Sequence, residues 1–179
     1  MKKQQYYKIG IVLILVFIVS ASGCISPTSN ETKTFSDGVM SFNYPEDFHN
    51  DTYSENTNSS MQLIGKLKNT IPFRVHDIAI FRNTSTTSPT QAREGVISVV
   101  KNMSTSEISS IATETNPNGI VIEKTTFTYE YTFGMRARFN DMFFKINDTV
   151  YVISVYGPDT TTSTQNIMNT ANIIFQSIK

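Results

Sequence analysis

Alternating apolar and polar positions predict short β-strands in the first half of the chain. The expected strands are residues 33–36 and 40–44 around an Asp37-Gly38 turn, then residues 61–67 and 73–82. The polar stretch 46–60 is expected to form an irregular loop. In residues 73–82, Phe73, Val75, Ala79 and Phe81 share one face and Ile78 and Ile80 share the other. Apolar side chains on both faces indicate a sheet that is covered on both sides.

The second half of the chain predicts a helix, a meander and a second helix. Ser88-Pro89-Thr90-Gln91 is typical of a helix start, since serine caps the helix and proline suits its first turn. The helix should present an apolar stripe of Ala92, Val96, Val99, Val100 and Met103. After a break at residues 116–119, an antiparallel meander is expected at 120–133, 135–146 and 149–156, with residues 149–156 as the central strand. A final helix is expected at 162–178.

The N-terminus has the three-part pattern of a secretory signal. Residues 1–8 are polar and positive, residues 9–19 are an unbroken apolar run, and small residues follow up to Cys24. The sequence Ala21-Ser22-Gly23-Cys24 resembles the lipobox of prokaryotic lipoproteins, which implies cleavage before Cys24 and a diacylglyceryl group on its sulfur. Two acyl chains give stable anchoring. The alternative is an uncleaved N-terminal transmembrane anchor, and both leave the following domain outside the cell.

These patterns divide the chain into three parts. Residues 1–23 are a predicted signal peptide, residues 24–33 comprise the lipidated cysteine and a flexible tether, and residues 34–179 form one α+β domain. A tether of this length spans roughly 16 Å, so the domain should stay close to the membrane. Asn-x-Ser/Thr sequons make glycosylation possible at Asn30, Asn58 and Asn83.

Charge and cysteine content exclude some functions. The whole chain is neutral, and its first 23 residues contain three lysines and no acid, so the remainder has a net charge of −3. A mildly acidic domain without basic clusters is a poor nucleic-acid binder. Because Cys24 is the only cysteine, disulfides within the chain and thiolate metal clusters are excluded.

Two segments near opposite ends of the domain resemble PsbP-like proteins. Residues 35–48 (FSDGVMSFNYPEDF) resemble the opening strand pair of that family, with its aromatic, glycine, aromatic and Tyr-Pro positions. Residues 149–156 (TVYVISVY), the closing helix and the tail 174–179 resemble the family's ending. The resemblance implies an antiparallel sheet of about six strands sandwiched by helices. It also implies relatives that act mostly by binding, among them photosystem-associated subunits and a Ran-binding protein.

Few residues suggest chemistry. His49 lies near Glu46, Asp47 and Asp51, but the spacing matches no zinc or calcium pattern, and a solvated loop is expected. His76 and Asp77 are strand neighbours, so their side chains should point to opposite faces. No nucleophile elbow, phosphate loop or carboxylate pair is present, and neither a cofactor nor a metal is expected.

Two groups of side chains suggest surfaces. Phe127, Tyr129, Tyr131 and Phe133 share one strand face, for which core packing is the favoured interpretation and a ligand-stacking surface the alternative. Arg136 and Arg138 share a face and are candidates to contact an acidic partner.

The sequence leads to a functional hypothesis of modest detail. We expect a non-catalytic, lipid-anchored binding or accessory domain at the outer face of the cytoplasmic membrane, acting on a membrane complex or cell-envelope component. Its partners would be membrane lipid through Cys24 and a protein at the membrane surface, with no nucleic acid. The alternatives are a small cell-envelope hydrolase and a lipoprotein that captures a small ligand.

Overall fold

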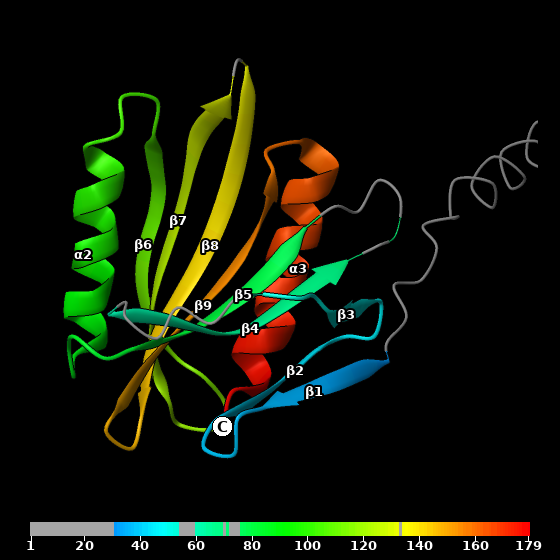
Figure 1. Ribbon diagram of the computed structural model, residues 1–179, viewed down its shortest axis with the longest axis vertical. Helices are drawn as coiled ribbons and strands as arrows, with labels where there is room; N and C mark the ends of the chain where they lie inside the picture. Colours follow the sequence, from blue (N-terminus) through cyan, green and yellow to red (C-terminus); the bar gives the residue numbers. More distant parts are fainter. Residues whose placement is uncertain (1–30, 54–59, 70, 72–75, 133) are drawn as a thin grey trace, which may run out of the picture. The chain divides into compact units, whose positions relative to one another are not determined.

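The antiparallel meander predicted for the second half of the chain forms three neighbouring strands of a seven-stranded sheet, from its central strand toward one edge (Figure 1). A computed structural model describes residues 31–53, 60–69, 71, 76–132 and 134–179. Its elements are, in chain order, β1 (Thr32–Ser36), β2 (Ser41–Pro45), β3 (Phe48–Asn50), β4 (Met61–Asn69), β5 (Asp77–Asn83), α2 (Pro89–Lys101), β6 (Glu107–Thr115), β7 (Val121–Thr132), β8 (Met135–Ile146), β9 (Thr149–Pro158) and α3 (Thr161–Ser177).

The sheet has the strand order β3-β4-β5-β9-β8-β7-β6, and every neighbouring pair is antiparallel. The strand β9 is therefore central, as its apolar residues on both faces predict. Ile153 and Val155 point to one face, whereas Val150 and Val152 point to the other, and all four are buried. The protein is of the α+β class, with helices on both faces of an antiparallel sheet (Figure 1).

One face of the sheet is closed by α3 together with the β1–β2 hairpin. The helix contributes an apolar stripe that includes Ile167, Ile174 and Phe175 to the larger core cluster. The hairpin is joined to the C-terminus by paired backbone hydrogen bonds between Ser41 and Lys179. These contacts bury the larger core on this side, which consists of Met40, Phe42, Tyr44, Phe48, Leu67, Ile78, Ile80, Ile122, Met142, Phe144, Tyr151, Ile153, Val155, Ile167, Ala171, Ile174, Phe175 and Ile178.

The opposite face is covered only in part, by α2. Ser88 caps this helix as predicted, because its side chain accepts a hydrogen bond from the backbone N–H of Gln91. A small core of Ala92, Phe143, Val150 and Val152 lies beneath α2. The helix contacts β6, β7 and β8 and scarcely reaches β9, so the β5 side of this face has no helix over it.

The predicted helical stripe of α2 needs a correction. Val100 and Ala92 are buried, but Val99 is 58% exposed and Met103 is 40% exposed. Ile97, which the predicted stripe omits, is buried instead. The helix is thus rotated so that Ile97 and Val100 face the sheet, which leaves Val99 at its border with solvent.

Two strands were missed by the sequence pattern. Residues 46–60 contain β3, which pairs with β4, and β6 precedes the predicted meander as its fourth strand. The first strand, β1, begins at Thr32, within the predicted tether, and Lys33 Nζ donates to the carbonyl of Phe48. Phe73 and Val75, which were expected to open the strand now seen as β5, lie outside the described residues.

The side chain of Asn116 joins the β6–β7 turn to the C-terminus. Its Nδ2 donates to the carbonyls of Phe175 and Ile178 at 3.1 and 2.8 Å. Its Oδ1 accepts from the backbone N–H groups of Asn118 and Ile120. All the polar atoms of this buried amide are therefore engaged, which fixes the last turn of α3 against the sheet.

Candidate binding groove

The partly covered face of the sheet carries a row of stacked aromatic rings. Phe127, Phe139 and Tyr156 lie opposite one another on β7, β8 and β9. The ring centroids of Phe139 lie 5.0 Å from Phe127, 5.4 Å from Tyr129 and 5.2 Å from Tyr156. Since neighbouring strands lie about 4.8 Å apart, this spacing follows from the strand register. We call Phe127, Tyr129, Phe139 and Tyr156 the aromatic row.

Two cavities flank this row. One has a volume of about 520 Å³ and lies between the row and α2, where Val96, Val99 and Met103 form its wall. The other has a volume of about 340 Å³ and is lined by Asp77, Tyr131, Tyr156 and Pro158 among others. Tyr129 and Phe139 line both cavities. We call the two cavities together the aromatic groove, and each lies in the size range of small-molecule sites.

The groove changes the interpretation of the aromatic stripe on β7. Core packing holds for Phe127, which is 5% exposed, but it is wrong for Tyr131, which is 52% exposed. Tyr129 is half-buried at the border of both cavities. Phe133 lies outside the described residues. The stripe therefore runs from the core into an open surface, in line with the alternative of a stacking surface.

Asp77 is the acidic residue in the lining of the groove. It lies opposite Tyr156 on the next strand, and its Oδ1 is buried without a hydrogen-bond partner among the described residues. Burial raises the pKa of Asp77, against the opposing effect of Lys66 and Lys68 on β4. Burial, the negative charge of Asp77 and the hydrogen bond that the Tyr156 hydroxyl donates to the Asp77 carboxylate raise the pKa of Tyr156.

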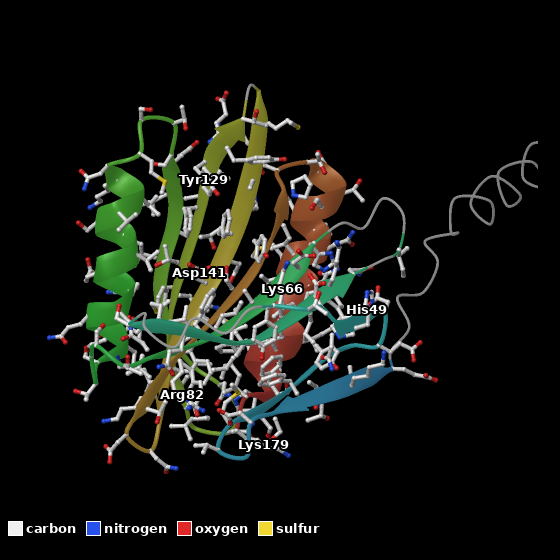
Figure 2. All side chains as sticks on the ribbon, viewed as in Figure 1. His49, Lys66, Arg82, Tyr129, Asp141 and Lys179 are labelled. Atoms are coloured by element: carbon white, nitrogen blue, oxygen red, sulfur yellow. The ribbon has the colours of Figure 1, made fainter. Side chains whose placement is uncertain are left out.

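A second buried carboxylate lies beneath the same face. Asp141 on β8 accepts a hydrogen bond from Ser154 Oγ at 2.6 Å, and burial raises the pKa of its carboxyl to about 7. Thr125 lies opposite Asp141 on β7, fully buried, with a hydroxyl that has no partner in the described part of the chain. Figure 2 shows Asp141 and Tyr129 on neighbouring strands of the sheet.

His76 borders the smaller cavity, although its ring is held on the α3 side. The ring Nε2 of His76 lies 2.9 Å from Thr170 Oγ1 of α3, and the ring packs edge-on against Phe48. The His76 ring is thus held on the face opposite the Asp77 side chain, as the strand alternation predicts. His49 is exposed on β3, far from Tyr129 in Figure 2.

The remaining candidate residues are held in intramolecular contacts. Asp51 pairs with Lys66 at 2.9 Å. Arg138 pairs with Asp159 at 2.9 Å, and Arg136 lies 3.6 Å from a carboxylate oxygen of Glu107. The two arginines therefore support the fold rather than stand free for an acidic partner. Among the described residues no cluster of three or more His, Cys, Asp or Glu side chains is arranged to hold a metal ion.

Of the modification sites predicted from sequence, the structure describes Asn83 alone. Cys24, Asn30 and Asn58 lie outside the described residues. Asn83 is the last residue of β5, only 9% exposed, and its Oδ1 accepts hydrogen bonds from Ser85. A glycan at Asn83 would require this side chain to leave its buried position. In the part of the chain that is described, no helix has the length and apolar character needed to cross a membrane.

Solved structures with the same architecture identify the fold. No family model and no curated protein matches the chain at the level of sequence. LpqN of Mycobacterium tuberculosis, described as involved in cell envelope biogenesis, is 14% identical with a TM-score of 0.56, covering 83% of this chain and 90% of its own. The cyanobacterial PsbP of Synechocystis is 8% identical with a TM-score of 0.56, covering 88% of this chain and 95% of its own. The Ran-binding protein Mog1p of Saccharomyces cerevisiae is 10% identical with a TM-score of 0.57, covering 83% and 95%.

These likenesses define a class of fold. The protein has the PsbP/Mog1-like fold, as the segments 35–48 and 149–156 predict. At identities of 8–14% the likeness extends to the fold alone.

Proposed function

We propose that this protein is a non-catalytic binding domain, lipid-anchored through Cys24 outside the cytoplasmic membrane, whose aromatic groove receives part of a membrane or cell-envelope partner. The observation that carries this proposal is the aromatic row, which stays open on one face while α3 and the β1–β2 hairpin close the other. A soluble domain gains stability by covering such rings, so rings left at an open groove favour binding.

Other observations agree with a binding role. The wall of the groove on α2 is apolar, and Val99 and Met103 remain substantially exposed there. His76 also lines the smaller cavity, but its ring is engaged on the α3 side, where Nε2 lies 2.9 Å from Thr170 Oγ1 and the ring packs on Phe48. The envelope role printed for LpqN is compatible with the same kind of work in this protein.

The groove can be tested by site-directed photocrosslinking in native membranes. A photoreactive amino acid at Val99 stands at the border of the groove. The same amino acid at Asn172, which is exposed on α3, reports on the closed side of the molecule. We expect a discrete adduct from position 99 and none from position 172. Equal labelling from both positions, or none from either, would remove the groove as the partner site.

The anchor is tested separately by Cys24→Ala. Without the thiol no thioether can form, so the variant should remain unprocessed or leave the membrane fraction. Ser26→Ala, two residues further along the predicted tether, is the matched control and should behave as the parent. A Cys24→Ala protein that is still cleaved and equally membrane-bound would show that the lipid assignment is wrong.

A further inference from the structure

The smaller cavity of the groove combines a carboxylate with aromatic rings. Asp77 shares its lining with Tyr129, Tyr131, Phe139 and Tyr156. We call this cavity the Asp77 pocket. Most of its described wall is aromatic or aliphatic, and Asp77 and His76 bring polar side chains to it, with Asp77 as the acidic group among the described residues of that lining.

The ring of Tyr156 ends the stack of aromatic rings on the side of the strand that carries Asp77. One face stacks on Phe139 with an interplanar angle of 4° and a centroid distance of 5.2 Å. Because that distance is close to the strand spacing, the ring planes stand across the sheet, and the second face of Tyr156 is turned toward β5. Asp77 is the residue of β5 that lies opposite Tyr156.

The charge of Asp77 is not neutralised by an ion pair within the described residues. Lys66, the cation with the largest electrostatic effect on the pKa of Asp77, forms an ion pair with Asp51 at 2.9 Å. Lys68 lies opposite Asp77 on β4, but its side chain is exposed and forms no ion pair with Asp77. His76 also borders the pocket, but its Nε2 is engaged with Thr170 on the α3 side. Oδ1 of Asp77 is thus buried without a hydrogen-bond partner among the described residues.

We propose that the Asp77 pocket binds the ammonium group of an organic cation, with the carboxylate of Asp77 as counter-ion and the ring of Tyr156 as a cation–π surface. The apolar body of the ligand would lie along Phe139 and Tyr129 toward α2. This inference rests on the proposed function, because it assigns a ligand chemistry to the same groove. The ammonium belongs either to a free amine or to a lysine side chain of the partner.

The preference for a cation would come from two attractions combined in one partly desolvated pocket, one to an aromatic ring and one to a carboxylate. An ammonium over an aromatic face is attracted by the ring quadrupole, and the attraction grows when water is excluded. A charge-assisted hydrogen bond to a carboxylate is stronger than a neutral one. A neutral alcohol of the same shape can still donate to the carboxylate, but it lacks the ion pair and the attraction to the ring, so the pocket should prefer the cation by about tenfold or more.

The test is calorimetric titration of the full-length protein in a nonionic detergent. The probes are phenethylammonium and phenethyl alcohol, which differ in the charged group alone. We expect the ammonium to bind at least about tenfold more tightly than the alcohol. Asp77→Asn, nearly identical in shape, should reduce that preference to the small part that the ring of Tyr156 supplies, while alcohol binding persists, which also shows that the groove remains folded. Asp148→Asn removes the same charge from an exposed turn between β8 and β9 and should leave the preference intact.

The outcomes separate this inference from the proposed function. Loss of the photoadduct at position 99 in the Asp77→Asn background, with weak binding of the free amine, would assign the ammonium to a lysine of the partner. Equal binding of alcohol and ammonium, or an unchanged preference in Asp77→Asn, would overturn the cation site. The cation site would also be overturned if neither probe binds and Asp77→Asn leaves the photoadduct at position 99 unchanged. In that case the groove would still be the partner site. Absence of the adduct alone would count against the proposed function and not against the cation site.

Discussion

Asp141 should make the stability of this fold depend on pH in a direction opposite to that of most paired carboxylates. The side chain is 5% exposed, and its hydrogen bond from Ser154 Oγ is the sole interaction that opposes the effect of burial on its pKa. The pKa rises from 3.8 to about 7 in the folded protein. Above about pH 4 the unfolded chain ionises this carboxyl, whereas the folded protein keeps it protonated until about pH 7.

The sign and size of the effect follow from proton uptake. In this interval the folded state binds one proton more than the unfolded state, so the free energy of unfolding falls as pH rises. At about 1.4 kcal/mol for each pH unit, the loss from Asp141 is on the order of 4 kcal/mol and is complete just above pH 7. Asp141→Asn cannot ionise, and its Oδ1 can still accept from Ser154. The free energy of unfolding of the variant, relative to that of the parent, should therefore rise by about 4 kcal/mol between about pH 4 and about pH 8.

The assay is urea denaturation of parent and variant across this pH range, followed by far-UV circular dichroism. The difference between the two proteins isolates Asp141, because all other titrating groups are common to both. Asp148→Asn, whose carboxylate is fully exposed, serves as the control and should differ from the parent by a constant amount. A parent–variant difference for Asp141→Asn that stays within about 1 kcal/mol over the whole range would refute the assignment of a raised pKa to this buried carboxyl.

Two further predictions concern packing and the C-terminal junction. Gly65→Ala should cost about 1–3 kcal/mol, since an added Cβ would lie 2.7 Å from a ring carbon of Phe35. Gly95→Ala on α2, where a Cβ meets open space, should stabilise the protein by about 1 kcal/mol, and urea denaturation measures both. Asn116→Ala should cost about 3 kcal/mol, because it leaves the carbonyls of Phe175 and Ile178 without this donor, and faster hydrogen exchange in the last turn of α3 would report it. An Asn116→Ala protein as stable as the parent would mean that water satisfies the Phe175 carbonyl and that Asn118 Nδ2, which also donates to the Ile178 carbonyl at 2.8 Å, suffices there.

The strands that the sequence predicts are those whose two faces meet different surroundings. On β5 and β9 the alternation is strong, because Ile80 and Ile153 face the α3 side while Phe81 and Val152 face the α2 side. The pattern fails for β6, an edge strand whose side chains are mostly exposed, so that serine, threonine and glutamate interrupt any alternation. It fails for β3 because three residues are too short to show a period.

The groove could not be predicted from the sequence, for a different reason. Periodicity places Phe127, Tyr129 and Tyr131 on one strand face, but it does not say where a covering helix stops. Asp77 and Tyr156 become neighbours only through the pairing of β5 with β9, which joins strands far apart in the chain. The local alternation does predict that His76 and Asp77 point apart, and the contact of His76 with Thr170 on α3 agrees with it, although His76 also borders the smaller cavity.

The connection between β5 and β6 explains why one face of the sheet stays open. These strands are third and seventh in the sheet order, so the chain between them must cross β9, β8 and β7 before β6 can pair. The single helix on this path, α2, lies over the β6–β8 side, and the β5 side of the same face is left without a helix (Figure 1). An opening of this kind follows from strand order and helix placement, which belong to the fold. The side chains that line it, Asp77 and Tyr156 above all, are set by this sequence and not by the fold, and for that reason the ligand has to be argued from them.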